Sequence, residues 1–505
     1  MGPRQARGAW MALSMTPLRL SIVVTVASAA SMALEIVASR MIAPYVGMSL
    51  YTWTAVIAVV LAGLALGHWV GGMLAGRRRA LFAVLAAGAV TAFATQFLLR
   101  GLAGGVLGAF DPVSGVVVLT TLVFFLPSLF AGAVGPMATF LALESCAEGQ
   151  QGRVLGRMCA LGAVGAIAGV LGSGLLSIPF IGSVWTVAVV AVAYAASAML
   201  VTRGPVRIAA GIAALVMLAA TAAFGASWTP CHRESGYFCI RVDDVTASAR
   251  VLALDHLAHG VNERDDPTRL HSPYVALIDE LAKRRFGEAG PEAAFFIGGG
   301  AYTLPRAWAA RWPSSDLVVA EIDPAVTAMA RERLWVDPGA FEVRHADARL
   351  ALASETRRFD AIVGDAFADI SIPPHLVSDE FHAEIAARLT PSGFYAMNVV
   401  DLLRHPRFLT SLAETLQRRF GSVELWLDRS AVSAEEARTT WIVVASRTPT
   451  AVARLGDGGG REWVRVPLDR MLKVVPDSQR IFLTDDHAPV ARLLGPLLRQ
   501  GRYSE

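Results

Sequence analysis

The sequence has very little lysine and little charge of either sign. Only Lys283 and Lys473 occur among its 505 residues, and charged residues make up 17% of the chain. The arginines responsible for most of the net charge of +3 are dispersed or lie at the edges of apolar segments. Nucleic-acid-binding domains instead cluster their basic residues on one face. We therefore exclude a nucleic acid as the partner of this chain.

Cysteine is also scarce. Of the four cysteines, Cys146 and Cys159 belong to the apolar N-terminal half, whereas Cys231 and Cys239 bracket a short segment just after it. The close spacing of the second pair is compatible with a disulfide, which would indicate an oxidising compartment. We expect no metal cofactor.

Long apolar runs, in contrast, are abundant. Hydrophobic residues make up 54% of the chain and the mean hydropathy is +0.48, which is too apolar for a purely soluble enzyme. The apolar excess ends near Ser227–Pro230. We therefore predict a membrane domain at residues 1–227 and a soluble domain at residues 228–505.

The membrane half contains seven apolar segments, each about the 20 residues that span a bilayer. The first lacks a clear small-residue cleavage site and runs directly into Glu35 and Arg40, so we interpret it as a retained helix rather than a signal peptide. The seven segments are 20–39, 52–75, 80–100, 116–143, 157–180, 184–202 and 207–226. Glycines recur at helix-packing spacing and predict closely packed helices: Gly63, Gly67, Gly71 and Gly72, then Gly162, Gly165, Gly169 and Gly172.

Two polar residues inside these segments are candidates for a membrane function. Glu35 lies in the first and His68 in the second, where polar groups are costly and usually turn toward a partner or cavity. The alternative is structural: Glu35 pairs with Arg40, and His68 donates a hydrogen bond to a backbone carbonyl.

Arginine placement predicts the orientation of the membrane half. Ten arginines fall on one side and only Arg40 and Arg100 on the other, so the positive-inside rule places the N-terminus in the cytoplasm. Seven spans then put the C-terminal domain outside, whereas a nucleotide-derived cofactor favours the cytoplasm. The ten are Arg4, Arg7, Arg19, Arg77, Arg78, Arg79, Arg153, Arg157, Arg203 and Arg207.

The soluble half begins with strand-like alternation over 228–262, which predicts a small antiparallel module. A helix at 273–285 follows, and strands then alternate with helices over 290–446, which predicts a parallel, doubly wound sheet. The strands 423–427 and 440–445 lack a helix between them and predict an antiparallel hairpin at the sheet edge. The expected strands are 293–297, 317–322, 341–345, 359–364 and 393–399, and the expected helices are 303–312, 324–334, 347–354, 376–389 and 407–419.

A nucleotide-site pattern opens this sheet. The apolar run 295–297 ends in Gly298, Gly299 and Gly300 before a helix, and a second strand ends in Glu321 about twenty residues later. Glycines let the backbone approach a ligand closely, and an acid at the next strand end suits ribose hydroxyls. A purely structural turn is the alternative.

Acids follow three successive strands. Glu321, Asp347 and Asp365 each stand at a carboxyl end, where parallel sheets bind ligands. Glu321 suits a ribose diol, Asp347 an adenine amine and Asp365 a substrate amine. Each acid could instead cap a helix, and for Asp347 this alternative is nearly as strong.

These motifs carry a resemblance. Residues from about 235 to 500 resemble the spermidine synthase (polyamine aminopropyltransferase) family, which has the class I methyltransferase fold, and the whole chain resembles bacterial membrane proteins that fuse such a domain to transporter-like helices. The matching stretches are 254–259, 297–301, 319–324, 345–348, 359–365 and 483–490 in the soluble half, and 33–45 and 61–67 in the membrane half.

The resemblance implies roles for individual residues. Asp365 is implied as the base that takes a proton from the attacking amine. The implied nucleoside-binding residues are His259, Gly298, Gly299, Gly300, Glu321, Asp347 and Ala348, and the implied substrate-binding residues are His271, Tyr274, Asp369, Asp485 and Asp486.

Two positions depart from the family pattern. Soluble members have acids that hold amino groups where this chain has Ala301 and Ala368. Ordinary aminopropylation of putrescine is therefore in doubt unless Asp369, Asp485 or Asp486 substitute for those acids.

The resemblance implies a membrane-anchored enzyme that transfers an aminopropyl group from decarboxylated S-adenosylmethionine to an amine or polyamine. One alternative is an S-adenosylmethionine-dependent methyltransferase acting on a membrane-delivered acceptor. The other is a transporter or sensor with a non-catalytic nucleoside- or polyamine-binding domain. We expect the protein in the bacterial inner membrane, in contact with the bilayer, with a homo-oligomer left open.

Overall fold

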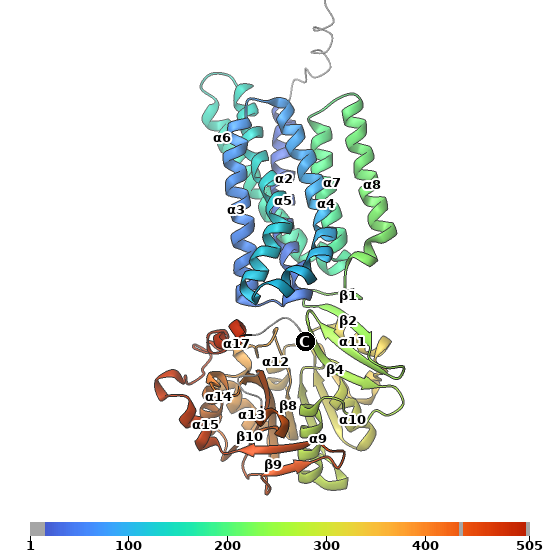
Figure 1. Ribbon diagram of the computed structural model, residues 1–505, viewed down its shortest axis with the longest axis vertical. Coiled ribbons are helices and arrows are strands. Elements are labelled where there is room, and N and C mark those ends of the chain that lie inside the picture. The colour runs from blue at the N-terminus through green and yellow to red at the C-terminus, as the bar shows by residue number, and fades with distance from the viewer. Residues whose placement is uncertain (1–15, 434–437, 501–505) are drawn as a thin grey trace, which may run out of the picture. The chain divides into compact units, whose positions relative to one another are not determined.

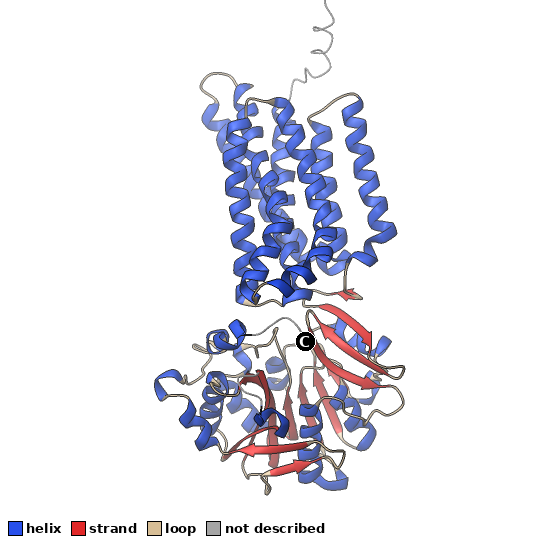
Figure 2. Ribbon diagram, viewed as in Figure 1, coloured by secondary structure: helices blue, strands red, loops and turns tan. Residues whose placement is uncertain are grey.

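The computed structural model describes residues 16–433 and 438–500. Its chain divides into two compact units, one ending at Cys239 and the other beginning at Ile240. The first is helical and the second mixes helices and strands (Figures 1 and 2). Each unit is described separately below.

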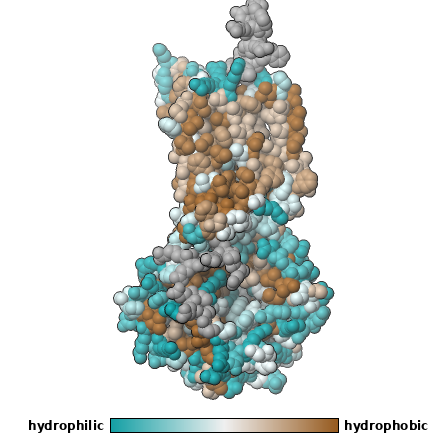
Figure 3. Space-filling model, viewed as in Figure 1, coloured by the Kyte–Doolittle hydropathy of each residue, from teal (hydrophilic) through white to brown (hydrophobic). Residues whose placement is uncertain are grey.

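The first unit is a bundle of long apolar helices. Proline in the first turn begins α2, α5 and α8, and the side chains of Ser49 and Asp111 cap α3 and α5. Apolar side chains cover much of the visible face of the bundle (Figure 3). The helices are α2 (Pro17–Val46), α3 (Leu50–Leu74), α4 (Arg78–Ala109), α5 (Pro112–Glu144), α6 (Gln151–Leu171), the π-helix η1 (Gly172–Ser177), α7 (Ile178–Leu200) and α8 (Pro205–Trp228).

In the described chain, six helices are long and apolar enough to cross a membrane, and one of them runs over 50 residues from Gln151 to Leu200. A straight helix of that length would measure about 75 Å, more than twice the thickness of the hydrocarbon core. It is broken at Gly182, where φ is 78° and ψ is 171°. Only glycine readily adopts this conformation.

The chain reverses at this break. Before it, α6 runs in the same direction as α2, because Gly165 lies against Thr25 and Gly169 against Ala29. After it, α7 runs the opposite way: Ser183 lines a pocket with Arg40, and Tyr194 reaches back to Ala27. Counted with this reversal, the six helices make seven passes.

Glycines bring two pairs of helices into backbone contact. A Cβ added at Gly67 would lie 2.1 Å from the Leu129 carbonyl oxygen on α5, and one at Gly169 would lie 2.1 Å from the Ala29 oxygen on α2. The predicted close packing is therefore confirmed for α3 with α5 and for α2 with α6. It does not extend to Gly72 or Gly172, which have nothing within 4 Å of such an atom.

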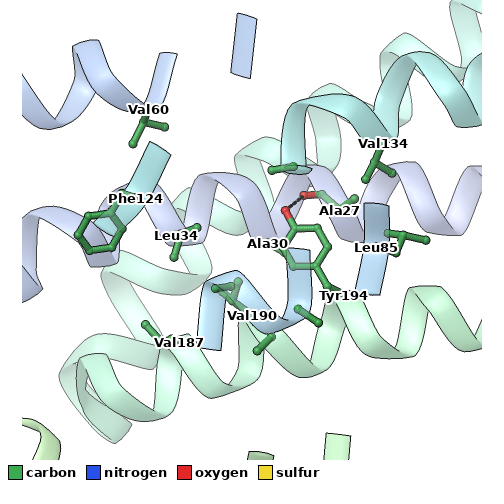
Figure 4. Packing of buried hydrophobic residues seen from close by; sticks show 14 of the residues in the cluster. Ala27, Ala30, Leu34, Val60, Leu85, Phe124, Val134, Val187, Val190 and Tyr194 are labelled. Carbon is green, nitrogen blue, oxygen red and sulfur yellow. Dashed lines mark hydrogen bonds between the residues drawn. The ribbon is translucent and has the colours of Figure 1, made fainter. Parts of the chain in front are cut away.

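The centre of the bundle is almost wholly apolar. Leu34, Leu85, Phe124 and Val187 are fully buried or nearly so (Figure 4). Tyr194 also lies there, and its hydroxyl donates a hydrogen bond of 3.3 Å to the Ala27 carbonyl oxygen. Packing and this hydrogen bond connect α2 with α7.

The second unit begins with the antiparallel strands β2 (Cys239–Asp244), β3 (Ala249–Leu254) and β4 (Leu257–Glu263), which follow the two-residue β1 (Arg233–Glu234). Strands and helices then alternate as predicted. The strands are β5 (Ala293–Ile297), β6 (Asp316–Ala320), β7 (Glu342–Arg344), β8 (Phe359–Gly364), β9 (Leu389–Leu402), β10 (Ser422–Asp428), β11 (Arg438–Ser446), β12 (Arg454–Gly456) and β13 (Glu462–Val466). The main helices are α9 (Pro273–Phe286), α10 (Thr303–Arg311), α11 (Pro324–Arg333), α12 (Ala348–Ala353), α13 (Asp379–Arg388), α14 (Arg407–Gln417), α15 (Leu468–Val474), α16 (Val490–Leu493) and α17 (Gly495–Gln500).

Nine strands form one sheet in the order β12-β13-β10-β11-β9-β8-β5-β6-β7. Strands β9, β8, β5, β6 and β7 are parallel neighbours, which confirms the predicted α/β, Rossmann-type fold. The chain moves one way from β5 through β6 to β7 and then returns to place β8 on the other side of β5. The gap between β5 and β8 is therefore the switch point where such sheets bind ligands.

The predicted hairpin forms, but its place at the sheet edge is wrong. β10 pairs antiparallel with β11, and β10 pairs on its other side with β13, which in turn pairs with β12. These two strands are short and are joined by a turn containing Gly458, Gly459 and Gly460, so alternation along the sequence gave little sign of them.

Candidate functional site

The glycine loop after β5 is the first part of the site. Gly298 has φ of 95°, and a Cβ there would lie 2.7 Å from the Asp365 carbonyl oxygen. Gly300 also has a positive φ, 51°. At position 298 only glycine allows both the positive φ and the close approach of the Asp365 carbonyl oxygen. The loop therefore places the ends of β5 and β8 in backbone contact.

Glu321, directly after β6, holds this loop. One carboxylate oxygen accepts hydrogen bonds from the Gly299 and Gly300 amides at 2.8 and 3.2 Å, and the other accepts from the Asp323 amide at 2.9 Å. Burial raises the pKa of Glu321, and these backbone amides oppose the increase. The sequence did not predict this positioning role, and ribose binding by Glu321 remains a prediction.

Asp365 follows β8 on the other side of the switch point. The Tyr274 hydroxyl donates to its Oδ2 at 3.0 Å, and the Asn398 amide donates to its Oδ1 at 2.9 Å. Burial raises the pKa of Asp365 to about 6, while Asn398 and Tyr274 oppose the increase. Both carboxylate oxygens are therefore oriented, and the group is a stronger base than an exposed aspartate.

Sequence reasoning missed Asn398. It is a buried amide in an otherwise apolar part of β9, Tyr395–Val400, and this polar interruption was the available signal. Its partner could not be identified in the sequence, because α13 separates β8 from β9 along the chain and the two strands become neighbours only in the folded sheet.

One pocket brings several predicted residues together. Its lining includes His259, Tyr274, Gly298, Gly299, Ala301 and Asp365. Burial, and secondarily His256, lower the pKa of His259 to about 4, so its imidazole is neutral near pH 7. A neutral imidazole can both donate and accept a hydrogen bond toward an uncharged ligand group.

Asp347 acts as a helix cap in this structure. Its Oδ1 accepts from the amides of Arg349 and Leu350 at 2.9 and 3.3 Å, and its Oδ2 lies 2.8 Å from His375 Nε2. Ala348 is the buried first residue of α12. The capping alternative is thus observed, and adenine binding by Asp347 and Ala348 stays a prediction.

Three substrate-binding candidates lie apart from the lining of this pocket. His271 Nε2 is 2.9 Å from Glu263 Oε2. Asp485 forms a two-pronged ion pair with Arg349, at 2.7 and 2.9 Å. Asp486 is exposed. None of these contacts directs a side chain toward Asp365.

Asp369 belongs to a second buried group of ionisable residues. It has φ of 61°, and its Oδ1 is buried 3.6 Å from His256 Nδ1. Burial, with the charge of Asp255 next in size, raises the pKa of Asp369 to about 7. His256 was named in the matching stretch 254–259, but no role was predicted for it.

The membrane candidates have different surroundings. The structural alternative, an ion pair of Glu35 with Arg40, does not form: Arg40 donates to the carbonyl oxygens of Tyr237 and Ser235 at 2.7 and 2.8 Å. Over residues 16–433 and 438–500, the Glu35 side chain makes no hydrogen bond or ion pair, although its backbone carbonyl accepts from Ser39 Oγ at 3.3 Å. His68 lies on the exposed face of α3 rather than turning inward.

Cys231 and Cys239 form the expected disulfide, and Cys146 and Cys159 are free thiols. Within the part of the chain that the structure describes, there is no group of three or more His, Cys, Asp or Glu side chains able to hold a metal ion.

The fold and these residues define a class: a multi-pass helical protein carrying a doubly wound α/β domain of the Rossmann type. In sequence, the chain is similar to polyamine aminopropyltransferases. It is 27% identical over 214 residues to a probable polyamine aminopropyl transferase of Bifidobacterium longum, covering 39% of this chain and 48% of that protein. It is 33% identical over 142 residues to the polyamine aminopropyltransferase of Vibrio vulnificus, covering 27% and 46%. The chain thus spans about half the length of these curated relatives.

Similar solved structures include a probable spermidine synthase from Corynebacterium glutamicum, at 22% identity and a TM-score of 0.41, covering 47% of this chain and 89% of that one. The spermidine synthase of Thermotoga maritima follows at 18% identity and a TM-score of 0.35, covering 42% and 71%. The chain matches no model of a known protein family.

Proposed function

We propose that this chain is a membrane-anchored, aminopropyltransferase-like enzyme that moves an aminopropyl group from decarboxylated S-adenosylmethionine to an amine. The observation that carries the proposal is Asp365, a carboxyl group of raised pKa, oriented by Tyr274 and Asn398 beside a glycine loop at the switch point of the sheet. The sequence similarity to polyamine aminopropyltransferases supports it.

The chemistry asks little of the protein beyond alignment and proton transfer. A sulfonium donor is already activated: the amine nitrogen forms a bond to the propyl carbon, the carbon–sulfur bond breaks, and its electron pair stays on sulfur as the neutral thioether of methylthioadenosine. The acceptor is an ammonium ion near pH 7, so it must first lose a proton. Asp365 accepts that proton, and Tyr274 and Asn398 fix the carboxylate toward the pocket.

The residues around the glycine loop fit a nucleoside. Gly298 and Gly299 line the pocket and have no side chains to block a ligand. The buried carboxylate of Glu321 would accept hydrogen bonds from ribose hydroxyls, which would take the place of some of its hydrogen bonds from the loop amides. We assign the donor to these residues together with Gly300, His259, Asp347 and Ala348.

We assign the acceptor to the Asp365 side of the pocket, with Tyr274 as the nearest further polar group and Asp369, His271, Asp485 and Asp486 as the remaining candidates. Ala301 is buried in the lining, so this wall supplies no carboxylate to an ammonium group. An acceptor other than putrescine is therefore favoured.

Asp365→Asn tests the proposal. An amide cannot accept the ammonium proton, so turnover should fall by about 10²–10⁴, the usual contribution of a positioned general base, while donor affinity stays near wild type. Asp360→Asn is the matched control, because Asp360 lies on β8, the strand that ends just before Asp365, but accepts from the Glu292 amide and the Thr390 hydroxyl instead. Wild-type turnover in Asp365→Asn would remove Asp365 from catalysis.

The product formed by the wild-type chain separates the alternatives. Methylthioadenosine as the product would support aminopropyl transfer, whereas S-adenosylhomocysteine would show methyl transfer instead. If the chain binds the donor but forms neither product, the result would favour a transporter or sensor over an enzyme.

A further inference from the structure

The last turn of α9 lies beside a cavity that the proposed reaction does not use. The cavity has a volume of about 470 Å³, within the range of about 300–1,000 Å³ that small-molecule sites occupy. It lies between α9, the start of β9, the end of β11 and the segment 449–451. Arg284, which lines it, follows Tyr274 by ten residues, or about 15 Å along α9. The cavity is therefore separate from the pocket at Asp365.

The floor of this cavity is apolar. Leu281, Phe394 and Val444 line it, and each is 4% exposed or less. Pro449 and Ala451 also line it and are exposed, so the cavity opens to the surface of the second unit. A ligand can therefore enter from the surface and place an apolar body against buried side chains.

Polar groups line the same cavity. Among the described residues, the Arg284 guanidinium has no hydrogen-bond or ion-pair partner, and the Thr450 hydroxyl has no hydrogen-bond partner. Arg285 is held in place, because its Nη2 donates to the Thr448 carbonyl oxygen at 2.7 Å and lies 3.1 Å from the Thr448 hydroxyl. The cavity thus combines an unengaged guanidinium, a fixed guanidinium and an unengaged hydroxyl.

An acid next to the cavity, Glu424 of β10, is engaged by other groups. Its buried carboxylate accepts from the Thr450 amide, and its Oε1 lies 3.4 Å from Arg465 Nη1. Arg465 therefore balances the charge of Glu424. Arg284 and Arg285 remain as surplus positive charge at the cavity, which favours an anionic ligand.

The chemistry of these groups selects the kind of anion. A guanidinium presents paired N–H donors that match the oxygens of carboxylates and phosphates, and a hydroxyl can donate to the same group. The apolar floor favours an organic body over a bare inorganic ion. We propose that this cavity binds a small organic anion, with its carboxylate or phosphate group on Arg284 and Thr450 and its apolar body on Leu281 and Phe394.

Fluorine NMR of 4-fluorophenyl phosphate with the full chain, in nanodiscs of phosphatidylcholine, tests this site. The wild type should bind the probe saturably. Arg284→Gln should weaken binding about tenfold or more, as for loss of a hydrogen bond to a charged group. Ala451→Phe should also weaken it, because a ring introduced at this exposed position would fill part of the cavity. 4-Fluorobenzyl alcohol, which has a similar body without the charge, should bind far more weakly.

Arg331→Gln is the matched control. Arg331 is also an exposed arginine in the last turn of a helix, α11, but it does not line the cavity. If Arg284 served only to complement the helix dipole, the two substitutions would have the same effect on binding. Both variants should unfold at the wild-type temperature without the probe, so that a folding defect does not explain a difference.

Three results would overturn the proposal. The first is the absence of saturable binding to the wild type. The second is wild-type affinity in both Arg284→Gln and Ala451→Phe. The third is equal affinity for the alcohol and the phosphate, which would show that the cavity does not recognise an anion. None of these measurements depends on the transferase activity.

Discussion

Asp365 should impose a pH dependence on the reaction. Its pKa, raised to about 6 by burial, means that the base form accumulates only as the pH passes 6. The kcat/KM should therefore rise between pH 5 and about 7 with a limb near 6, and fall off below it. By linkage, the protonated group stabilises the fold below the unfolded pKa of about 4, and this contribution is lost as the pH rises through 6.

Tyr274→Phe sharpens this measurement. The Tyr274 hydrogen bond favours the carboxylate and so lowers the pKa of Asp365. Its removal should move the acidic limb to higher pH, whereas a limb that belongs to the substrate would not move.

Glu321 should contribute to donor binding. Glu321→Ala removes a buried carboxylate from the glycine loop, and donor affinity, measured calorimetrically, should weaken by roughly 1.5–3 kcal/mol. Asp457→Ala is the control: Asp457 also accepts from two backbone amides of a glycine turn, those of Gly459 and Arg461, but that turn does not line the pocket, whereas Gly299, which Glu321 holds, does. Equal affinity in the wild type and Glu321→Ala would remove Glu321 from the donor site.

At the scale of single residues, the sequence indicated where the acids of the site lie better than it indicated which residues contact them. Asp365 and Glu321 could be found because an acid after a parallel strand must face the ligand edge of the sheet. The contacts from Asn398 and Tyr274 could not be foreseen, since they depend on the register of β9 beside β8 and on the placement of α9.

At the scale of helices, Gly67 should be intolerant of a side chain. The Leu129 carbonyl oxygen lies 2.1 Å from the Cβ position of Gly67. Because it is a backbone atom, it can move away only if helix α5 itself shifts. Gly67→Ala should therefore separate α3 from α5 and destabilise the protein by about 1–3 kcal/mol, measured as thermal unfolding in detergent. Gly72→Ala, which meets nothing within 4 Å, should be neutral. Equal stability of the two variants would contradict backbone contact between α3 and α5.

Helices and strands with a clear period were predictable, and those defined by their neighbours were not. The strands 293–297 and 359–364 have the predicted bounds, because each is a short apolar run with turn residues beyond it. β12 and β13 were missed because three to five residues carry no period of their own. The reversal at Gly182 was implied only by the predicted gap between two apolar segments.

For the whole molecule, the number of passes decides which face of the membrane the enzyme occupies. With seven passes, Pro17 of α2 and Trp228 of α8 lie on opposite faces. The arginines of the described helix starts, such as Arg78, Arg153 and Arg207, all lie at the Pro17 end; Arg4 and Arg7 fall outside the described residues. The positive-inside rule then predicts that the Pro17 end is cytoplasmic. The disulfide of Cys231 with Cys239, beyond α8, agrees with an oxidising compartment on the other side.

Cysteine labelling in intact cells should therefore distinguish the two faces. Glu288 is exposed in the second unit, so Glu288→Cys should react with a membrane-impermeant maleimide before lysis. Cys146, in the loop between α5 and α6, lies at the Pro17 end and provides an internal control that should react only after lysis. Cys159→Ala removes the remaining free thiol.

If Glu288→Cys reacts only after lysis while Cys146 reacts before it, the arginine asymmetry does not set the orientation. The second unit then shares the compartment in which S-adenosylmethionine is made. If the predicted order holds, a donor must reach the outer face of the membrane.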